Sequence, residues 1–367
     1  MNHVLHLRSL ISGRTFRTDE IDYVDPEFGP DGIVDVVYDY DLIKRHISRE
    51  SLRDNRDYSM WRYKPLLPIE PDAAVPPLQI GWTPIYDTPR LAADLGLRRL
   101  WVKDDGRNPT ASFKDRASAI AVIKAQERGA EIITTASTGN AAAALSGICA
   151  SVDQANVIFV PEKAPQAKVA QLLAYGAMVM LVKGNYDDAF ELCLRATDTY
   201  GWYNRNTGFN PYMSEGKKTA TLEICEQLSW QAPDRIFVSV GDGCIIGGLH
   251  KGLKDLLALG WIDHMPKMMG VQAEGSNYLA EAWENGEDVL TKAPIDAQTV
   301  ADSISAGLPR DRMKAMAAVK ETGGAYITLT DEEILAAIPA LARGSGVFAE
   351  PAGAAAYAGL VKAVDQG

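Results

Sequence analysis

Residues 108–116 read Asn-Pro-Thr-Ala-Ser-Phe-Lys-Asp-Arg and join a turn signal to an Ala-rich helical pattern at residues 117–126. The Asn-Pro pair breaks regular structure, and the hydroxyl group of Ser112 can cap the first helical turn. Lys114 is therefore predicted to lie beside the positive end of a helix dipole. That position favours the neutral amine, which is the form that makes a Schiff base with an aldehyde cofactor. The alternative interpretation is a surface lysine paired with Asp115.

Short apolar runs alternate with Ala-rich runs on either side of this helix. Buried strands are expected at residues 100–103, 132–135, 157–160 and 178–182, and helices at 140–150, 165–175 and 186–200. A second series has strands at 236–240 and 270–273 and a helix at 249–259. Further helices are expected from Glu215 and at 351–360. Near the N-terminus, residues 33–38 are strand-like and the charged stretch at 42–57 has a helical pattern. The alternation of strands and helices implies parallel sheets covered on both faces. We predict an α/β fold with two three-layer parallel-sheet domains, and the cleft between them is the default ligand site.

The composition excludes several classes of protein. A chain of 367 residues with 47% hydrophobic and 23% charged residues fits two globular domains. Its net charge of −11 argues against a nucleic-acid partner. Because no apolar run approaches the ~18 residues of a membrane span, we expect a soluble cytoplasmic protein. The four cysteines lie far apart and are expected to be reduced thiols: Cys149, Cys193, Cys225 and Cys244.

Residues 241–248, Gly-Asp-Gly-Cys-Ile-Ile-Gly-Gly, follow a predicted strand and precede a helical pattern. Backbone N–H groups in such a turn can converge on a phosphate together with the helix dipole. The glycine spacing misses the dinucleotide pattern by one residue and lacks a Gly-Lys-Ser/Thr ending, so neither NAD nor ATP is supported. The alternative is a plain strand-to-helix turn.

Residues 137–140, Ser-Thr-Gly-Asn, also lie between a predicted strand and a helix. Hydroxyl, amide and free N–H groups at that place can hold a carboxylate. A simple helix N-cap is the alternative, and it supplies the same donors.

Six segments, taken in order, resemble those of the threonine synthase family of fold-type II pyridoxal-phosphate enzymes. They are Met60–Tyr63, Asn108–Arg116, Ser137–Asn140, Glu215–Thr219, Gly241–Gly243 and Glu350–Ala355. The resemblance covers about residues 55–360. It implies a tryptophan-synthase-β-like fold, pyridoxal 5'-phosphate as cofactor, a small-molecule amino-acid substrate and a homodimer.

The resemblance implies a lyase that eliminates a β- or γ-leaving group from an amino acid and then adds water. Conversion of phosphohomoserine to threonine is the leading interpretation. A β-replacement enzyme such as cysteate synthase and a threonine or serine dehydratase are the alternatives. A cofactor-free homologue is disfavoured because the lysine, the asparagine and the glycine loop are all present.

Residue roles and domain boundaries also come from the resemblance. Lys114 would bond to the cofactor and shuttle protons, Asn140 would bond its ring oxygen, and Ser137 and Thr138 would hold the substrate carboxylate. The cofactor phosphate would be bound by Gly241, Asp242, Gly243, Cys244 and Ile245, and the substrate also by Asn210 and Lys217. The expected domains are an irregular N-terminal extension (1–75), a large cofactor-binding domain (76–122 and 206–367) and a smaller mobile domain (123–205).

The chain departs from the family pattern in two donors for the substrate phosphate. Met213 stands where threonine synthases usually carry an arginine, and Ala141 where they carry a hydroxyl residue. The two-point hydrogen bonding of an arginine guanidinium to a phosphate dianion is hard to replace. Lys217, Lys218 or Arg205 would have to supply the missing donors.

Two further family features are missing from the sequence. A zinc ribbon is not expected, because no cysteine precedes Cys149. The family's Thr-Gly-x-Gly segment for the pyridine nitrogen would follow position 367. Either the sequence is truncated or the nitrogen finds another partner.

Overall fold

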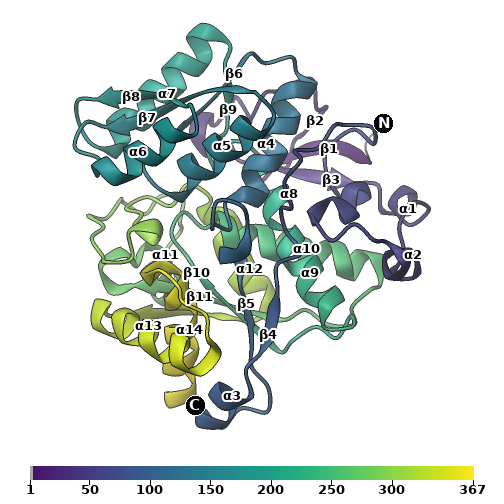
Figure 1. Ribbon diagram of the computed structural model, residues 1–367, viewed down its shortest axis with the longest axis vertical. Coiled ribbons are helices and arrows are strands. Elements are labelled where there is room, and N and C mark those ends of the chain that lie inside the picture. The colour runs from purple at the N-terminus through teal and green to yellow at the C-terminus, as the bar shows by residue number, and fades with distance from the viewer. Residues whose placement is uncertain (1–2) are drawn as a thin grey trace. The chain divides into compact units, whose positions relative to one another are not determined.

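The computed structural model describes residues 3–367 (Figure 1). The chain divides into two compact units. The first unit contains the chain up to Trp82 together with Asp105–Thr219. The second contains Thr83–Asp104 and Ala220–Gly367. The division into domains at residues 75, 122 and 205 stays a prediction.

A four-stranded parallel sheet forms the centre of the first unit. Its order is β8-β7-β6-β9, with β6 (Ile132–Ala136), β7 (Ala155–Pro161), β8 (Met178–Val182) and β9 (Tyr203–Asn204). Helices α5 (Asn140–Ser151), α6 (Gln166–Ala174) and α7 (Tyr186–Tyr200) connect the strands (Figure 1). Because side chains alternate along a strand, Ala136, Val157 and Phe159 share one face, where they pack with Phe190 and Cys193 of α7. The predicted parallel sheet is confirmed here.

Helix α4 (Asp115–Glu127) follows the turn at residues 108–114 and is buried along most of its length. Eleven of its residues, Asp115–Ala125, are buried, which agrees with an Ala-rich sequence that has no polar face. Helix α8 (Tyr212–Lys217) packs against it. Helix α9 (Thr219–Gln227) follows directly.

The N-terminal region is more regular than the sequence indicates. Strands β1 (Val4–Ser9), β2 (Thr15–Phe16) and β3 (Val34–Tyr38) form an antiparallel sheet of order β2-β1-β3. The strand-like pattern at residues 33–38 is confirmed as β3. The charged stretch at 42–57, predicted as one helix, forms two short helices, α1 (Tyr40–Ile43) and α2 (Arg49–Asp54), because Ser48 starts α2 with a capping box. A 3₁₀ segment, η2 (Met60–Leu66), follows.

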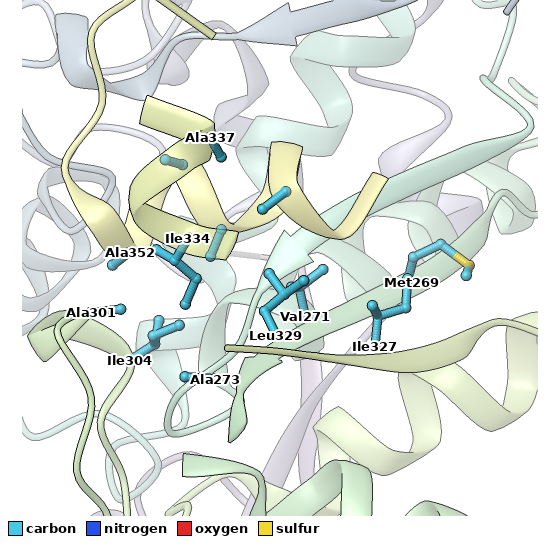
Figure 2. Packing of buried hydrophobic residues seen from close by; sticks show 13 residues of the cluster. Met269, Val271, Ala273, Ala301, Ile304, Ile327, Leu329, Ile334, Ala337 and Ala352 are labelled. Atoms are coloured by element: carbon cyan, nitrogen blue, oxygen red, sulfur yellow. The ribbon is translucent and has the colours of Figure 1, made fainter. Parts of the chain in front are cut away.

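The second unit is built on the parallel sheet β10-β11-β12. Its strands are β10 (Arg235–Ser239), β11 (Lys267–Ala273) and β12 (Ala325–Leu329), and its helices are α10 (Cys244–Leu259), α11 (Tyr278–Asn285), α12 (Arg312–Thr322), α13 (Asp331–Ser345) and α14 (Pro351–Asp365). Figure 2 shows Val271, Ile327 and Leu329 of the sheet facing Ile334 and Ala337 of α13. A hairpin of β4 (Ile85–Asp87) and β5 (Trp101–Lys103), with α3 (Pro89–Asp94) between its strands, belongs to the same unit.

Two helix starts differ from the sequence prediction. Helix α10 begins at Cys244 instead of Leu249, because Gly243 adopts a left-handed conformation that starts the helix directly after the glycines. Helix α8 begins at Tyr212 instead of Glu215, with Pro211 as its N-cap residue. Within residues 3–367, no helix is both long and apolar enough to cross a membrane.

Candidate active site

Lys114 lies at the start of a buried helix, as the sequence predicts. It is the N-cap residue of α4, and it is half-buried. The Ser112 hydroxyl accepts the backbone N–H of Lys114 at 3.1 Å, so it holds the lysine's own backbone and not a later N–H of the helix. The preceding turn is fixed by Asn108, whose amide accepts the Gly81 N–H and donates to the Asp105 carbonyl, both at 2.9 Å.

The next residue, Asp115, anchors the helix to the turn. Its carboxylate is fully buried and accepts both the Thr110 N–H, at 2.8 Å, and the Thr110 hydroxyl. Burial raises the pKa of Asp115, and the two bonds from Thr110 oppose that shift. The alternative interpretation of Lys114 requires a solvent-exposed pair with Asp115, and a buried Asp115 does not provide one.

Arg116 ties the same turn to α9. Its guanidinium is fully buried and makes a two-point ion pair with Asp105, at 2.7 and 2.9 Å, and a 2.9 Å bond to the Thr219 hydroxyl. A Cβ atom on Gly216 of α8 would overlap the Arg116 carbonyl. The glycine of the Glu215–Thr219 segment is therefore required by the close contact between α8 and α4.

The Ser137–Asn140 segment connects β6 to α5. The Ser137 N–H donates to the Phe159 carbonyl at 3.1 Å, and its hydroxyl accepts the Gly139 N–H at 3.2 Å. Gly139 is the N-cap residue of α5, and no side chain caps this helix. Ser137, Thr138 and Asn140 beside this uncapped N-terminus are all half-buried. A helix start of this kind attracts a carboxylate.

A residue that the sequence analysis did not single out holds this segment in place. The Asn206 side chain accepts the Thr135 hydroxyl at 2.8 Å and the Ala136 N–H at 2.9 Å, at the end of β6. It also contacts Cys193 at 3.5 Å, and burial raises the pKa of that thiol to about 11. The only sequence signal was the position of Asn206 at the start of the Asn-Thr-Gly-Phe-Asn-Pro stretch.

Asn210, a predicted substrate ligand, has its amide engaged inside the unit. It donates to the Tyr203 hydroxyl at 3.0 Å and to the Asn204 carbonyl at 2.8 Å, and it accepts the Tyr212 N–H at 3.0 Å. These bonds fix the turn that leads into α8. Its role toward a substrate stays a prediction, and the observed bonds favour a supporting role.

The three cations considered for a substrate phosphate have different surroundings. The Lys217 ammonium donates to the Thr207 hydroxyl at 2.7 Å and lies 3.4 Å from the Met213 carbonyl. Lys218 makes a fully buried ion pair with Glu215 at 2.6 Å, and Arg205 donates to the Ser118 hydroxyl at 3.1 Å.

In the second unit, the glycine loop ends at the N-terminus of α10. Gly243 has φ +87°, and no side chain caps this helix. A Cβ atom would meet Ile304 Cα at 2.8 Å on Gly241, Ala315 Cβ at 2.6 Å on Gly243, and Lys314 Cβ at 2.7 Å on Gly247. Ile304, Lys314 and Ala315 pack against the glycines of the loop, and no side-chain cap accepts the N–H groups at the start of α10. This arrangement suits a phosphate.

Comparison with known proteins supports the same class of enzyme. The model of the family described as pyridoxal-phosphate dependent enzyme matches residues 77–367. The threonine synthase of Methanocaldococcus jannaschii is 40% identical over 363 residues, which cover 98% of this chain and 88% of that protein. The threonine synthase of Methanosarcina acetivorans is 41% identical over 363 residues, with coverage of 99% and 87%.

Solved structures with the same fold include the processed form of threonine deaminase isoform 2 from Solanum lycopersicum and the serine racemase of maize. The first has a TM-score of 0.66 and 20% identity, and covers 89% of this chain and 81% of that one. The second has a TM-score of 0.66 and 21% identity, with coverage of 78% and 83%. These identities are low, so they confirm the predicted fold class alone.

The family match and the long alignments with threonine synthases establish the cofactor as pyridoxal 5'-phosphate and the protein as an enzyme. The chain belongs to the pyridoxal-phosphate-dependent enzymes and, within them, to the threonine synthase family of lyases.

Proposed function

We propose that the chain eliminates a β- or γ-leaving group from an amino acid and then adds water, with phosphohomoserine as the leading substrate and threonine as product. The threonine synthase relatives support this reaction. The observation that carries the proposal is Lys114 at the N-cap of α4, with Ser112 holding its backbone and with buried bonds locking the following two residues. A fixed backbone limits the positions that the reacting amine can reach.

The residues of each unit fit pyridoxal 5'-phosphate. The uncapped N-terminus of α10, with its glycines packed against Ile304 and Ala315, would hold the phosphate through the N–H groups of residues 243–245. Lys114 would bond to the aldehyde, and Asn140 would bond the ring oxygen. When bound, the cofactor supplies an electron sink for the substrate carbanion.

Lys114 also has the proton-transfer role in this proposal. Its Nζ would take the proton from the substrate Cα and return a proton after the leaving group departs. A positioned amine of this kind contributes roughly 10²–10⁴-fold to rate. Ser137, Thr138 and the N-terminal N–H groups of α5 would hold the α-carboxylate, which orients the Cα–H bond toward the amine.

Replacing Lys114 tests the assignment directly. Lys114→Ala should abolish the visible absorption band of the lysine-bound cofactor and reduce turnover by at least about 10²-fold, because both the covalent bond and the proton carrier are lost. Borohydride reduction followed by peptide mapping locates the modified lysine. Lys44→Ala, which removes an exposed lysine of the same unit, is the control. A borohydride-reducible adduct on another lysine in the Lys114→Ala protein would refute the assignment.

The substrate's phosphate depends on cations in the first unit. Met213 is buried and provides no charge, whereas Lys218 is paired with Glu215. Lys217, bonded to the neutral Thr207 hydroxyl, is therefore the best-placed compensating cation. Charge-assisted bonds are worth roughly 1.5–3 kcal/mol each, so loss of one donor costs about one to two decades of affinity.

Substrate profiling separates the leading reaction from its alternatives. We expect poor saturation by phosphohomoserine in the parent protein, a further rise in KM in Lys217→Met, and better turnover in the double variant Met213→Arg with Ala141→Thr. Phosphohomoserine, homoserine, threonine, and phosphoserine with sulfite are compared by steady-state kinetics. A micromolar KM for phosphohomoserine in both the parent and Lys217→Met would reject the role of Lys217. Turnover of phosphoserine with sulfite, but not of phosphohomoserine, would favour β-replacement.

We also propose a cytoplasmic location and a homodimer. The location is supported by the four cysteines, which are buried and free, because disulfides are common in secreted proteins and rare in the reducing cytosol. The homodimer rests on the family resemblance, and sedimentation of the purified protein measures it.

A further inference from the structure

Two helix N-termini meet the glycine loop within the second unit. Helix α10 starts at Cys244, directly after the loop, and α12 starts at Arg312. Packing brings them together, because α12 residues Lys314 and Ala315 lie where Cβ atoms on Gly247 and Gly243 would be. Each helix end carries a partial positive charge. The two ends do not have the same partner.

Asp242 of the loop accepts two backbone N–H groups at the start of α12. Its side-chain Oδ1 accepts the Arg310 N–H at 3.2 Å, and its carbonyl accepts the Asp311 N–H at 2.8 Å. The N-cap residue of α12, Asp311, makes no side-chain cap bond of its own. One residue thus bonds two consecutive N–H groups that are almost seventy positions away in the sequence. The end of α10 has no such side-chain partner.

This division agrees with the charges involved. A carboxylate in contact with the cofactor phosphate would be repelled by it, and the repulsion grows as water is excluded. Near the start of α12, the same carboxylate is stabilised by the Arg310 N–H and by the dipole of that helix. The favourable place for the Asp242 side chain is therefore the end of α12, where the structure has it.

We propose that Asp242 is a positioning residue for the phosphate site. It holds the Asp242–Gly243 backbone against the start of α12, so that the N–H groups at the start of α10 keep the orientation that binds phosphate. The proposal rests on the proposed function, because it assumes that the glycine loop binds the cofactor phosphate. The role of Asp242 as a direct cofactor ligand stays a prediction. In this proposal its side chain acts through Arg310, and its carbonyl acts through Asp311.

The test compares pyridoxal 5'-phosphate with pyridoxal, which lacks the phosphate. Equilibrium dissociation constants of both are measured on the cofactor-free protein by fluorescence titration. Asp242→Ala should weaken the binding of pyridoxal 5'-phosphate by about tenfold or more, as expected for loss of a charge-assisted hydrogen bond, and leave pyridoxal binding unchanged. Asp242→Asn keeps an acceptor oxygen and removes the charge, so it should bind pyridoxal 5'-phosphate at least as tightly as the parent.

The outcomes separate the role of the glycine loop in phosphate binding from the role of Asp242 in positioning that loop. Asp263→Ala, which removes an exposed carboxylate of the same unit, is the control. If the parent binds both compounds equally, the loop is not the phosphate site and the proposed function of the loop fails. If the parent prefers the phosphate form and Asp242→Ala keeps that preference, only the role of Asp242 is overturned. Should Asp242→Ala not fold, loss of the preference in Asp242→Asn overturns the role, and retention supports it.

Discussion

At the scale of single residues, Tyr326 and Tyr278 form a natural pair for comparison. Both are buried in the second unit. Among residues 3–367, the Tyr326 hydroxyl has no hydrogen-bond partner, and burial raises its pKa. The Tyr278 hydroxyl instead contacts the carbonyls of Val289, at 3.0 Å, and Lys292, at 2.8 Å. Burial of an unsatisfied hydroxyl is costly, whereas a satisfied one is nearly neutral or favourable.

We predict that Tyr326→Phe raises the free energy of unfolding by about 1–2 kcal/mol, because it removes an unpaired hydroxyl and keeps the ring that covers Gly270. Tyr278→Phe should lower it by about 0.5–1.5 kcal/mol, because a made bond is lost. Urea unfolding of the two variants measures both. Equal effects of the same sign would contradict the assignment of an unsatisfied hydroxyl to Tyr326 and a bonded hydroxyl to Tyr278.

At the scale of elements, the contact between α4 and α8 depends on Gly216. A Cβ atom there would overlap the Arg116 carbonyl and lie 3.0 Å from Ala117 Cα. The obstacle is backbone, so α8 itself would have to move. Movement of α8 carries Lys217 with it and disturbs the first turn after Lys114.

Gly216→Ala should therefore lower stability by about 3 kcal/mol or more, at the upper end of overpacking effects, and also raise the KM for substrate. Gly353→Ala is the matched helical control, since its Cβ would meet only Ala349 Cβ at 3.3 Å. That variant should be neutral or more stable by up to about 1 kcal/mol. Thermal midpoints and KM values are measured together. A Gly216→Ala protein as stable as the control would show that α8 does not need this contact.

Helix α13 begins with a capping box that depends on pH. Glu333 accepts the Thr330 N–H at 2.7 Å and pairs with Lys362 of α14 at 3.0 Å. Burial raises the pKa of Glu333, but the Thr330 N–H and the Lys362 ammonium outweigh it, and the net pKa is lowered. A lowered carboxylate pKa stabilises the fold above the unfolded-state pKa, near 4.3. That contribution is lost as the pH falls through the lower folded-state value.

Glu333→Gln should thus be less stable than the parent at pH 7, by roughly 0.2–1 kcal/mol for a partly exposed pair, and the difference should vanish in acid. Gln keeps an acceptor for the capping box, so the comparison isolates the charge. Thermal midpoints from pH 7 to pH 3 measure it, with Glu332→Gln as a control for the helix dipole. A difference that persists unchanged at pH 3 would rule out the charge as its cause.

At the scale of the whole molecule, the cofactor should stabilise the fold. A ligand that binds only the folded chain adds RT ln(1 + [L]/Kd), about 2.7 kcal/mol at a hundredfold excess over Kd. We expect calorimetry of the cofactor-free protein to show a lower thermal midpoint than that of the loaded protein. In Lys114→Ala the shift should be smaller, because the covalent bond is gone and the phosphate contacts remain. Identical midpoints with and without cofactor would contradict the prediction.

The amount that could be predicted from sequence differed between parts of the chain. Strands β6 and β7 are buried in a parallel sheet, so they appear as apolar runs, and their positions were correct within a few residues. The position of β8 was also correct, but the expectation that it is buried was wrong: it is an edge strand, and only Val182 is buried. Strand β1 mixes His6 and Arg8 with apolar residues, because its antiparallel sheet is partly exposed, and it was missed. The early starts of α8 and α10 depend on Pro211 and Gly243, whose effects are conformational and leave no apolar periodicity.

By itself, the sequence determined the family, the cofactor, the α/β class and the position of Lys114 at a helix start, because motifs and periodicity are local in the chain. Only the tertiary structure decided which groups meet across long separations: Gly216 against Arg116, Asn206 at the end of β6, and Asp242 at the start of α12. The reason is physical. A hydrogen bond or a close contact between distant residues depends on how elements pack, and no local pattern records its partner.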